Sequence, residues 1–223
     1  MPIDIYRSQR RGGKGITGIA TREEDFVKQI FTASTHDTIL FFTNKGKLYK
    51  LRGFEIPEAG RTARGTAIVN LLSLDAGEKV SAVIPIQNFA EGKYLLMATK
   101  NGLIKKTALV EYNSARRTGL QGITLKEDDE LITVRLTDGE DNVVLVTREG
   151  MCITFDEKEV RPIGRVSQGV IGIRLDEGDE VIGMESVISG GKGATLLAIT
   201  ENGFGKITEK RILKVKCVSY RQL

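Results

Sequence analysis

One internal repeat runs through most of the 223 residues and limits the fold more than any single motif does. An apolar run followed by Thr, two variable residues and Gly occurs four times, and the successive threonines are 56, 48 and 53 residues apart. These threonines are Thr43, Thr99, Thr147 and Thr200. Two more elements keep the same period: a small or basic turn that leads into alternating apolar residues, and an acidic turn before another apolar stretch. Such a period is typical of a chain built from stacked copies of one supersecondary unit.

The repeated unit has the pattern of β-strands. Apolar and polar residues alternate within it, as in Ile39, Phe41 and Thr43, and β-branched residues are frequent. Each Thr-x-x-Gly element places its glycine where a hairpin needs a positive φ. Units of about 50 residues with about four strands each favour blades around an axis over a single sandwich. We therefore predict an all-β, propeller-like fold of about four to five four-stranded blades, in which only residues 21–31 have a pattern that would suit a helix.

The repeat is incomplete at both ends of the sequence. It begins at a basic turn without a preceding Thr-x-x-Gly hairpin, and residues 209–223 abandon the pattern. We interpret both ends as truncated relative to the period. The expected organisation is a partial β-domain of about four repeats at residues 1–208, followed by a divergent basic tail at 209–223.

Composition argues against several classes of protein. No apolar run reaches the ~18 residues of a membrane span, and the N-terminus lacks the apolar region of a secretory signal, so we expect a cytoplasmic chain. Cys152 and Cys217 lie far apart, and His36 is the single histidine, so the sequence supports neither a disulfide framework nor a zinc site. Residues 13–18 match the spacing GxGxxG, but they lack the buried strand and the helix of a dinucleotide site. We expect no metal and no cofactor.

The basic charge is concentrated at the two ends of the chain. The formal net charge is +4. The first 20 residues hold four basic residues and one acidic residue, and residues 206–223 hold six and one, so the segment between them is net −4. This distribution favours a nucleic-acid partner more strongly than the total charge does.

The N-terminal basic turn has the chemistry of a phosphate-binding loop. Its seven residues are Gln9, Arg10, Arg11, Gly12, Gly13, Lys14 and Gly15. Glycines allow the backbone to approach phosphates closely, and guanidinium groups make bidentate contacts to them. In isolation, such a turn is more often a solvated surface. The repeats favour the functional interpretation, because equivalent turns supply Arg61, Arg64, Arg116, Arg117, Arg161 and Arg165. If the units are blades, these cations form one curved track that bends duplex DNA.

A second set of cations surrounds the predicted hairpin tips. These candidates for DNA contact are Lys45, Lys47, Lys50, Lys100, Lys105, Lys106 and Lys206. The alternative is that they protect exposed strand edges against pairing with other molecules, and the sequence favours neither interpretation. We expect the acidic turns to form a face that is turned away from DNA.

The residues 9–15, QRRGGKG, match the seven-residue signature called the gyrase A box. With the β-repeats, this motif makes the chain resemble the C-terminal DNA-wrapping domain of the bacterial DNA gyrase A protein, from about Pro2 to Lys206. Further matching stretches are residues 56–71, 100–109, 160–170 and 201–206.

The resemblance implies a β-pinwheel, a propeller variant whose blades exchange strands and whose basic rim bends DNA with positive handedness. It implies double-stranded DNA and the remaining gyrase A and B subunits as partners, at the nucleoid in the bacterial cytoplasm. None of the five tyrosines lies in a motif that matches the active-site tyrosine of the cleavage domain. We therefore expect no catalytic residues and a non-catalytic module of an ATP-dependent type II topoisomerase. The alternative function is a propeller-like protein-interaction scaffold without a role on DNA.

Overall fold

The Thr-x-x-Gly elements form the hairpins of the protein. The computed structural model describes residues 8–15, 18, 26–60, 63–188, 195–199 and 202–209. In this part of the chain the hairpins are β1 (Thr38–Thr43) with β2 (Lys47–Arg52), β4 (Tyr94–Thr99) with β5 (Leu103–Ala108), β8 (Asn142–Thr147) with β9 (Cys152–Asp156), and β12 (Thr195–Ile199) with β13 (Gly205–Glu209). Their turn glycines have φ values of +73° to +83°. The predicted hairpins and their positive-φ glycines are confirmed.

Each of the first three hairpins is joined by a third strand, which follows the next acidic turn in the sequence. These inner strands are β3 (Val80–Ile86), β7 (Leu131–Thr137) and β11 (Val181–Val187). Each inner strand pairs antiparallel with the first strand of its hairpin, and the register shifts at the same point in all three sheets. Short 3₁₀ helices follow the hairpins: η2 (Gly53–Glu55), η4 (Leu109–Tyr112) and η5 (Glu157–Glu159). A further one, η3 (Ile68–Asn70), follows the basic turn that ends at Gly65.

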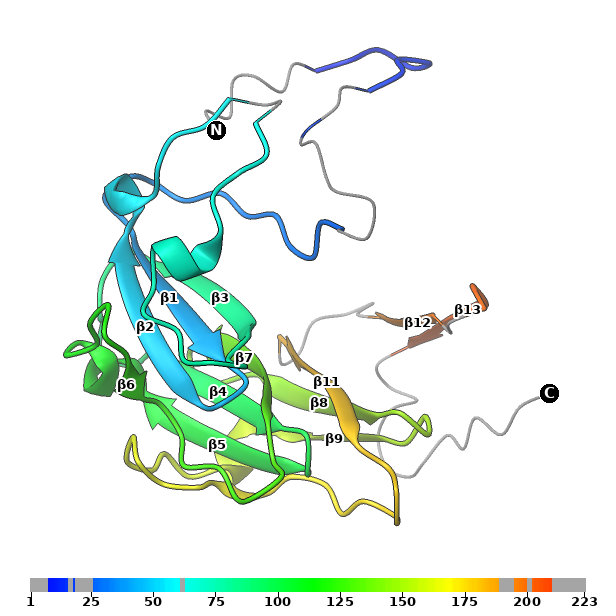
Figure 1. Cartoon of the computed structure of the whole chain (residues 1–223). Coiled ribbons are helices and arrows are strands. Elements are labelled where there is room, and N and C mark those ends of the chain that lie inside the picture. Colours follow the sequence, from blue (N-terminus) through cyan, green and yellow to red (C-terminus); the bar gives the residue numbers. More distant parts are fainter. Residues whose placement is uncertain are drawn as a thin grey trace.

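Neighbouring units exchange a short strand. β6 (Leu120–Gln121) pairs with β2 of the preceding unit, and β10 (Val170–Ile171) pairs with β5. The described residues therefore form two four-stranded sheets, β3-β1-β2-β6 and β10-β5-β4-β7, a three-stranded sheet β11-β8-β9, and the two-stranded sheet β12-β13 (Figure 1).

The hairpin glycines make this exchange possible. The Gly46 carbonyl accepts hydrogen bonds from the N–H groups of Gly122 (2.8 Å) and Ile123 (3.1 Å), and the Gly102 carbonyl accepts the equivalent pair from the next unit. A Cβ at Gly46 would lie 2.7 Å from the Ile123 oxygen, and the φ of Gly46 is +73°. Glycine is thus required at this position for both its conformation and the close approach of the next unit.

Successive sheets pack face to face, so β4 is buried on both sides. Leu95 and Met97 pack against the first sheet, whereas Leu96 and Ala98 pack against the third. Alternate side chains of β4 thus pack against the sheets on its two sides, and these contacts join the three sheets into one arc. The all-β fold class is confirmed.

Residues 26–31 form neither a helix nor a strand, so the helical pattern of residues 21–31 was misleading in this part. Residues 21–25 and the tail 210–223 lie outside the described residues. No helix within the described ranges has the length and hydrophobicity that crossing a membrane requires.

Candidate nucleic-acid interface

The N-terminal basic turn is held together by its uncharged residues. The Gln9 side-chain oxygen accepts a hydrogen bond from the Gly15 N–H (2.9 Å), and the Gly13 N–H donates to the Arg10 carbonyl (2.9 Å). Gly12 and Gly15 have φ values of +88° and +71°. A Cβ at Gly13 would lie 2.5 Å from the Gln9 oxygen. Glutamine and glycines therefore build a closed loop, which leaves the cationic side chains outside it.

All three cations of this turn are exposed. Within the described ranges, Arg10, Arg11 and Lys14 form no ion pair and no side-chain hydrogen bond. Exposed cations without a carboxylate partner remain available to phosphate oxygens, which they bind through charge-assisted hydrogen bonds.

The same turn recurs along the chain. The Gly13–Arg10 hydrogen bond has counterparts from the Ala63 N–H to the Gly60 carbonyl (3.0 Å) and from the Ser167 N–H to the Gly164 carbonyl (3.1 Å). The glycine that ends each basic turn has a positive φ in all four cases: Gly15 (+71°), Gly65 (+77°), Gly119 (+88°) and Gly169 (+104°). Three of the four basic turns thus share one hydrogen-bonded shape, whereas the turn that ends at Gly119 closes with a bond from the Gly119 N–H to the Arg116 carbonyl (3.3 Å).

Strand exchange places the turns at 114–119 and 161–169 against the outer edge of a preceding sheet. The Lys50 N–H of β2 donates to the Arg116 carbonyl (3.4 Å), and the Ile163 N–H donates to the Lys106 carbonyl of β5 (2.8 Å). In Figure 1 the turns at 114–119 (green) and 161–169 (yellow) border the sheets, whereas residues 63–67 (cyan) lie in a loop that rises above the first sheet and the turn at 8–15 (blue) projects beyond it.

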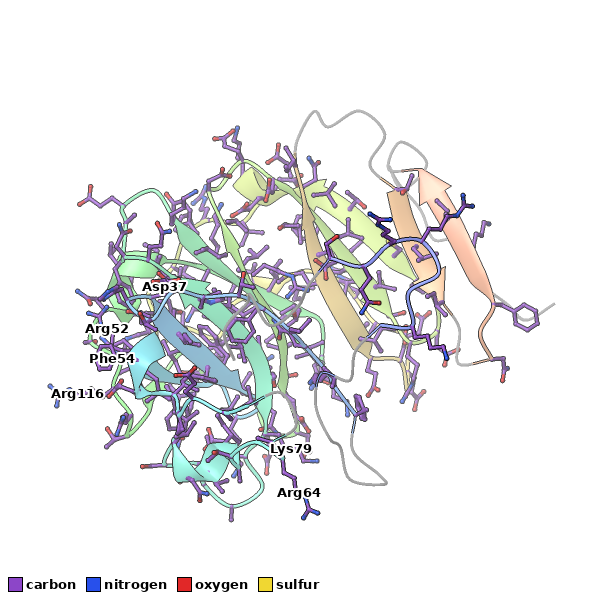
Figure 2. All side chains as sticks on the ribbon, turned by 90° about the horizontal axis from the view of Figure 1, so that it is seen from above. Asp37, Arg52, Phe54, Arg64, Lys79 and Arg116 are labelled. Atoms are coloured by element: carbon purple, nitrogen blue, oxygen red, sulfur yellow. The ribbon has the colours of Figure 1, made fainter. Side chains whose placement is uncertain are left out.

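The turn arginines differ in their availability. Arg64, Arg116 and Arg161 are exposed and have no ion pair within the described part, and Figure 2 shows Arg64 and Arg116 directed away from the ribbon. Arg117 is bound to Glu55 (2.7 Å). Arg165 is half-buried and donates to the Gln121 carbonyl (2.7 Å). Arg61 lies outside the described residues.

The hairpin-tip lysines have partners inside the protein. The Lys45 ammonium donates to the Ala76 carbonyl (2.7 Å), Lys47 is paired with Asp75, and the Lys50 ammonium donates to the Asn113 carbonyl (2.6 Å). Lys100 is paired with Glu180 (3.0 Å), and Lys206 is exposed on β13. These contacts favour a structural role for the first four.

Lys105 and Lys106 are a correction to the predicted interface. They are 0% and 4% exposed, so neither can reach a phosphate and neither protects an exposed edge. The Lys105 ammonium donates to the carbonyls of Gly122 (2.9 Å) and Arg165, which ties segments of two other units to β5. Burial lowers the pKa of Lys105 to about 8.

Lys106 is held by a buried carboxylate. Its ammonium donates to the Glu157 carbonyl (2.8 Å) and lies 3.8 Å from the Glu157 side-chain oxygen. Thr137 donates to the same carboxylate (2.5 Å). The alternating pattern missed both lysines because it cannot distinguish an outward face from a face that the next unit covers.

The acidic turns have a structural role that their sequence did not reveal. Glu78 is buried and accepts hydrogen bonds from Thr43 (2.5 Å) and Tyr49 (2.8 Å). Asp129 accepts from the Asn101 N–H (2.9 Å), and Asp179 accepts from the Glu149 N–H (3.0 Å). One carboxylate of each acidic turn therefore fixes a hairpin tip, and the expectation of a DNA-averse face stays a prediction.

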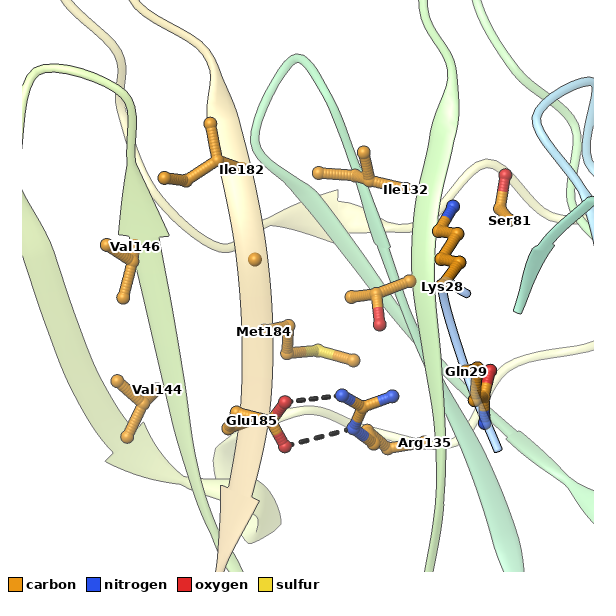
Figure 3. A pocket seen from close by; sticks show the side chains of 12 residues that line it. Lys28, Gln29, Ser81, Ile132, Arg135, Val144, Val146, Ile182, Met184 and Glu185 are labelled. Carbon is orange, nitrogen blue, oxygen red and sulfur yellow. Dashed lines mark hydrogen bonds and ion pairs between the residues drawn. The ribbon is translucent and has the colours of Figure 1, made fainter. Parts of the chain in front are cut away.

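A cavity of about 600 Å³ lies between the inner strands (Figure 3). It is lined by Ile132, Val144, Ile182 and Met184 among others, and Arg135 and Glu185 neutralise each other at its margin. No histidine or cysteine is among its lining residues.

Comparison with known proteins identifies the family. The model of the "DNA gyrase C-terminal domain, beta-propeller" family matches residues 1–34, 37–87, 93–138 and 141–188. This chain belongs to that family. It is 54% identical over 169 residues to the DNA gyrase A protein of Clostridium acetobutylicum, which covers 76% of the chain and 20% of the relative. It is 45% identical over 209 residues to the DNA gyrase A protein of Staphylococcus aureus, which covers 93% of the chain and 23% of the relative. The chain spans about a fifth of the length of these relatives.

Solved structures agree with this assignment. The crystal structure of the C-terminal domain of DNA topoisomerase IV matches with a TM-score of 0.73 at 36% identity, over 79% of this chain and 55% of that one. The structure of the DNA gyrase A C-terminal domain matches with a TM-score of 0.74 at 25% identity, over 97% of this chain and 69% of that one. The family resemblance and the propeller-type fold predicted from the sequence are confirmed.

Proposed function

We propose that this gyrase C-terminal domain binds duplex DNA along its basic turns and bends it, as the wrapping module of a type II topoisomerase. The observation that carries the proposal is the recurring basic turn, which ends each time in a glycine of positive φ and carries an exposed cation at Arg10, Arg64, Arg116 and Arg161. In such an enzyme the module would present wrapped DNA for strand passage and negative supercoiling.

The geometry favours contact with the phosphate backbone over the reading of bases. The available cations are Arg10, Arg11, Lys14, Arg64, Arg116 and Arg161, and they lie on turns without a projecting helix or ribbon. Neutralising about six phosphates gives a log–log salt slope near −5. Bending 20 to 30 base pairs by 40 to 90° costs roughly 1 to 6 kcal/mol, so several contacts must act together. Binding should therefore be steeply salt-dependent and largely independent of sequence.

Membership of the gyrase family supports a proposal for the partners. The remaining gyrase A and gyrase B subunits would supply cleavage and ATP hydrolysis, and the nucleoid of the bacterial cytoplasm would be the location. The chain itself would contribute binding geometry and no catalytic group.

A mobility-shift measurement with two unrelated duplexes at two salt concentrations tests the proposal. We expect similar affinity for both duplexes and a steep loss at the higher salt. A shift of only one of the two duplexes would contradict recognition of the phosphate backbone. No shift of either duplex at low salt would favour the protein-interaction scaffold instead.

The matched control variant is Lys79→Ala/Lys126→Ala/Arg148→Ala, which removes three exposed charges near the hairpin tips. Arg148 is paired with Glu180 at the surface, so its loss should have little effect on stability. We expect this variant to bind both duplexes as the parent does. A large loss would mean that total charge, and not the basic turns, determines binding.

A further inference from the structure

Three segments that are distant in sequence meet at the buried ammonium of Lys105 on β5. The ammonium donates to the main-chain carbonyl of Gly122, which follows β6 (2.9 Å), and to that of Arg165, in the basic turn at 161–169. The Arg165 guanidinium donates in turn to the Gln121 carbonyl (2.7 Å), which is next to the first of these acceptors in the chain. β5, the exchanged segment and the basic turn are thus joined by a closed set of three contacts.

Two further residues hold the middle of the same turn. The Arg165 N–H donates to the Glu111 carboxylate (2.8 Å), and the Thr124 hydroxyl donates to the Val166 carbonyl (2.5 Å). Glu111 and Thr124 flank the preceding basic turn, at 114–119, on its two sides in the sequence. Two successive basic turns are therefore bound to each other through these flanking residues as well as to their sheets.

The corresponding position of the first sheet is filled by a different kind of side chain. The exchanged strands pair with Leu48 of β2 and Ile104 of β5, so the residues that follow these, Tyr49 and Lys105, correspond. Both are 0% exposed, but the Tyr49 hydroxyl donates to the Glu78 carboxylate (2.8 Å), which precedes β3 of the same sheet. The first junction thus has an aromatic side chain bonded within its own sheet, whereas the second has a cation bonded to two other segments.

Packing alone does not account for a lysine at this position. Burial of an ammonium costs free energy that an apolar side chain of similar length would not cost. What the ammonium adds is a pair of charge-assisted hydrogen bonds directed at two main-chain carbonyls. These bonds fix the separation of the two segments that carry the carbonyls.

We propose that Lys105 is a positioning residue that fixes the spacing of the basic turns at 114–119 and 161–169 and thereby the curvature of DNA bound along them. This inference rests on the proposed function. The exposed cations of the two turns are Arg116 and Arg161, and Lys105 is buried, so it acts on DNA through the main chain of the turns. Two contact sites of fixed spacing force the duplex to bend, whereas sites of variable spacing allow it to stay closer to straight and to avoid the elastic cost.

Distances between spin labels test the spacing in the full chain without DNA. The labels are attached at Thr118→Cys and Gln168→Cys, two exposed positions on the two turns, in a Cys152→Ser/Cys217→Ser background. We expect a narrow distance distribution in this labelled parent and a broadened or shifted one when Lys105→Met is added. A distribution that Lys105→Met leaves unchanged would overturn the proposal.

The matched control is Lys106→Met, which removes the neighbouring buried lysine. Its ammonium is bound to Glu157 and not to the turn, so the control should keep the parent distribution, and equal broadening would contradict the role of Lys105. Circular dichroism checks that the variants fold. If Lys105→Met does not fold, Thr124→Val decides: it keeps every charge, loses the hydrogen bond to Val166 and should broaden the distribution to a smaller extent.

The effect on DNA separates positioning from contact. With a duplex of about 30 base pairs and saturating protein, Lys105→Met should leave the duplex ends farther apart than the parent does. The salt slope should stay near about −5, because every exposed cation is kept. Arg161→Ala, which removes one exposed cation, should instead weaken the slope by about one, and Lys106→Met should match the parent in both measurements.

The outcomes for Lys105 and for the proposed function are distinguishable. A Lys105→Met variant that bends the duplex as the parent does would contradict the positioning role and leave the proposed function standing. A parent that leaves the duplex straight would contradict the proposed function, and the spin-label distances then decide whether Lys105 fixes the spacing of the turns.

Discussion

Removing the three cations of the N-terminal turn separates binding from folding. In Arg10→Ala/Arg11→Ala/Lys14→Ala the turn keeps its internal hydrogen bonds, because these use the Gln9 side chain and backbone groups. The free energy of unfolding should change by less than about 0.5 kcal/mol, since the lost side chains are exposed and unpaired in the described part. If all three contact phosphates, the salt slope should weaken from about −5 to about −3. Affinity at about 0.1 M salt should then fall by roughly 10² to 10³-fold.

Fluorescence anisotropy with a labelled duplex, repeated over a salt series, measures both the affinity and the slope. The Lys79→Ala/Lys126→Ala/Arg148→Ala variant, which has the same net charge as the triple turn variant, is the control and should keep the parent slope. A turn variant with unchanged slope, or one that unfolds in urea at a much lower concentration, would refute the reasoning.

Three further substitutions test the architecture by urea unfolding. Gly102→Ala should lower the free energy of unfolding by about 1 to 3 kcal/mol, because φ is +83° and the new Cβ would lie 2.6 Å from a carbonyl oxygen of the exchanged segment. The control Gly77→Ala, at a glycine with a similar φ and open space around it, should lower it less. Equal losses for the two variants would contradict the close approach at Gly102. Burial lowers the pKa of Lys105 from 10.5 to about 8, so between these pH values the unfolded chain binds more protons than the folded one. The parent should therefore gain stability relative to Lys105→Met as the pH rises through this window. A stability difference between the two proteins that does not change with pH would contradict burial of the ammonium. Glu157→Gln should cost about 3 kcal/mol by removing the buried negative charge beside the Lys106 ammonium, which then keeps its hydrogen bond to the main-chain carbonyl of residue 157. Adding Lys106→Met should recover part of that loss, whereas additive costs would mean that the two charges do not interact.

The hairpins were predictable from sequence because their determinants are local. A threonine, two variable residues and a glycine specify a turn whatever lies around it, and alternation identifies the strands. The basic turns were predictable for the same reason, since a glycine with positive φ ends each of them.

The contacts between units were not predictable in this way. β6 and β10 are two residues long, and each depends on a carbonyl of the preceding hairpin that only the folded arrangement presents. The burial of Lys105 likewise depends on Gly122 and Arg165, which are distant in sequence.

The central claim is that turns on successive blades form one curved track for duplex DNA. Energy transfer between dyes on the two ends of a duplex of about 30 base pairs measures this directly. At saturating protein, we predict that the ends approach each other with the parent and with the hairpin-tip control variant. Saturated binding to a duplex that keeps its straight end-to-end distance would contradict the claim.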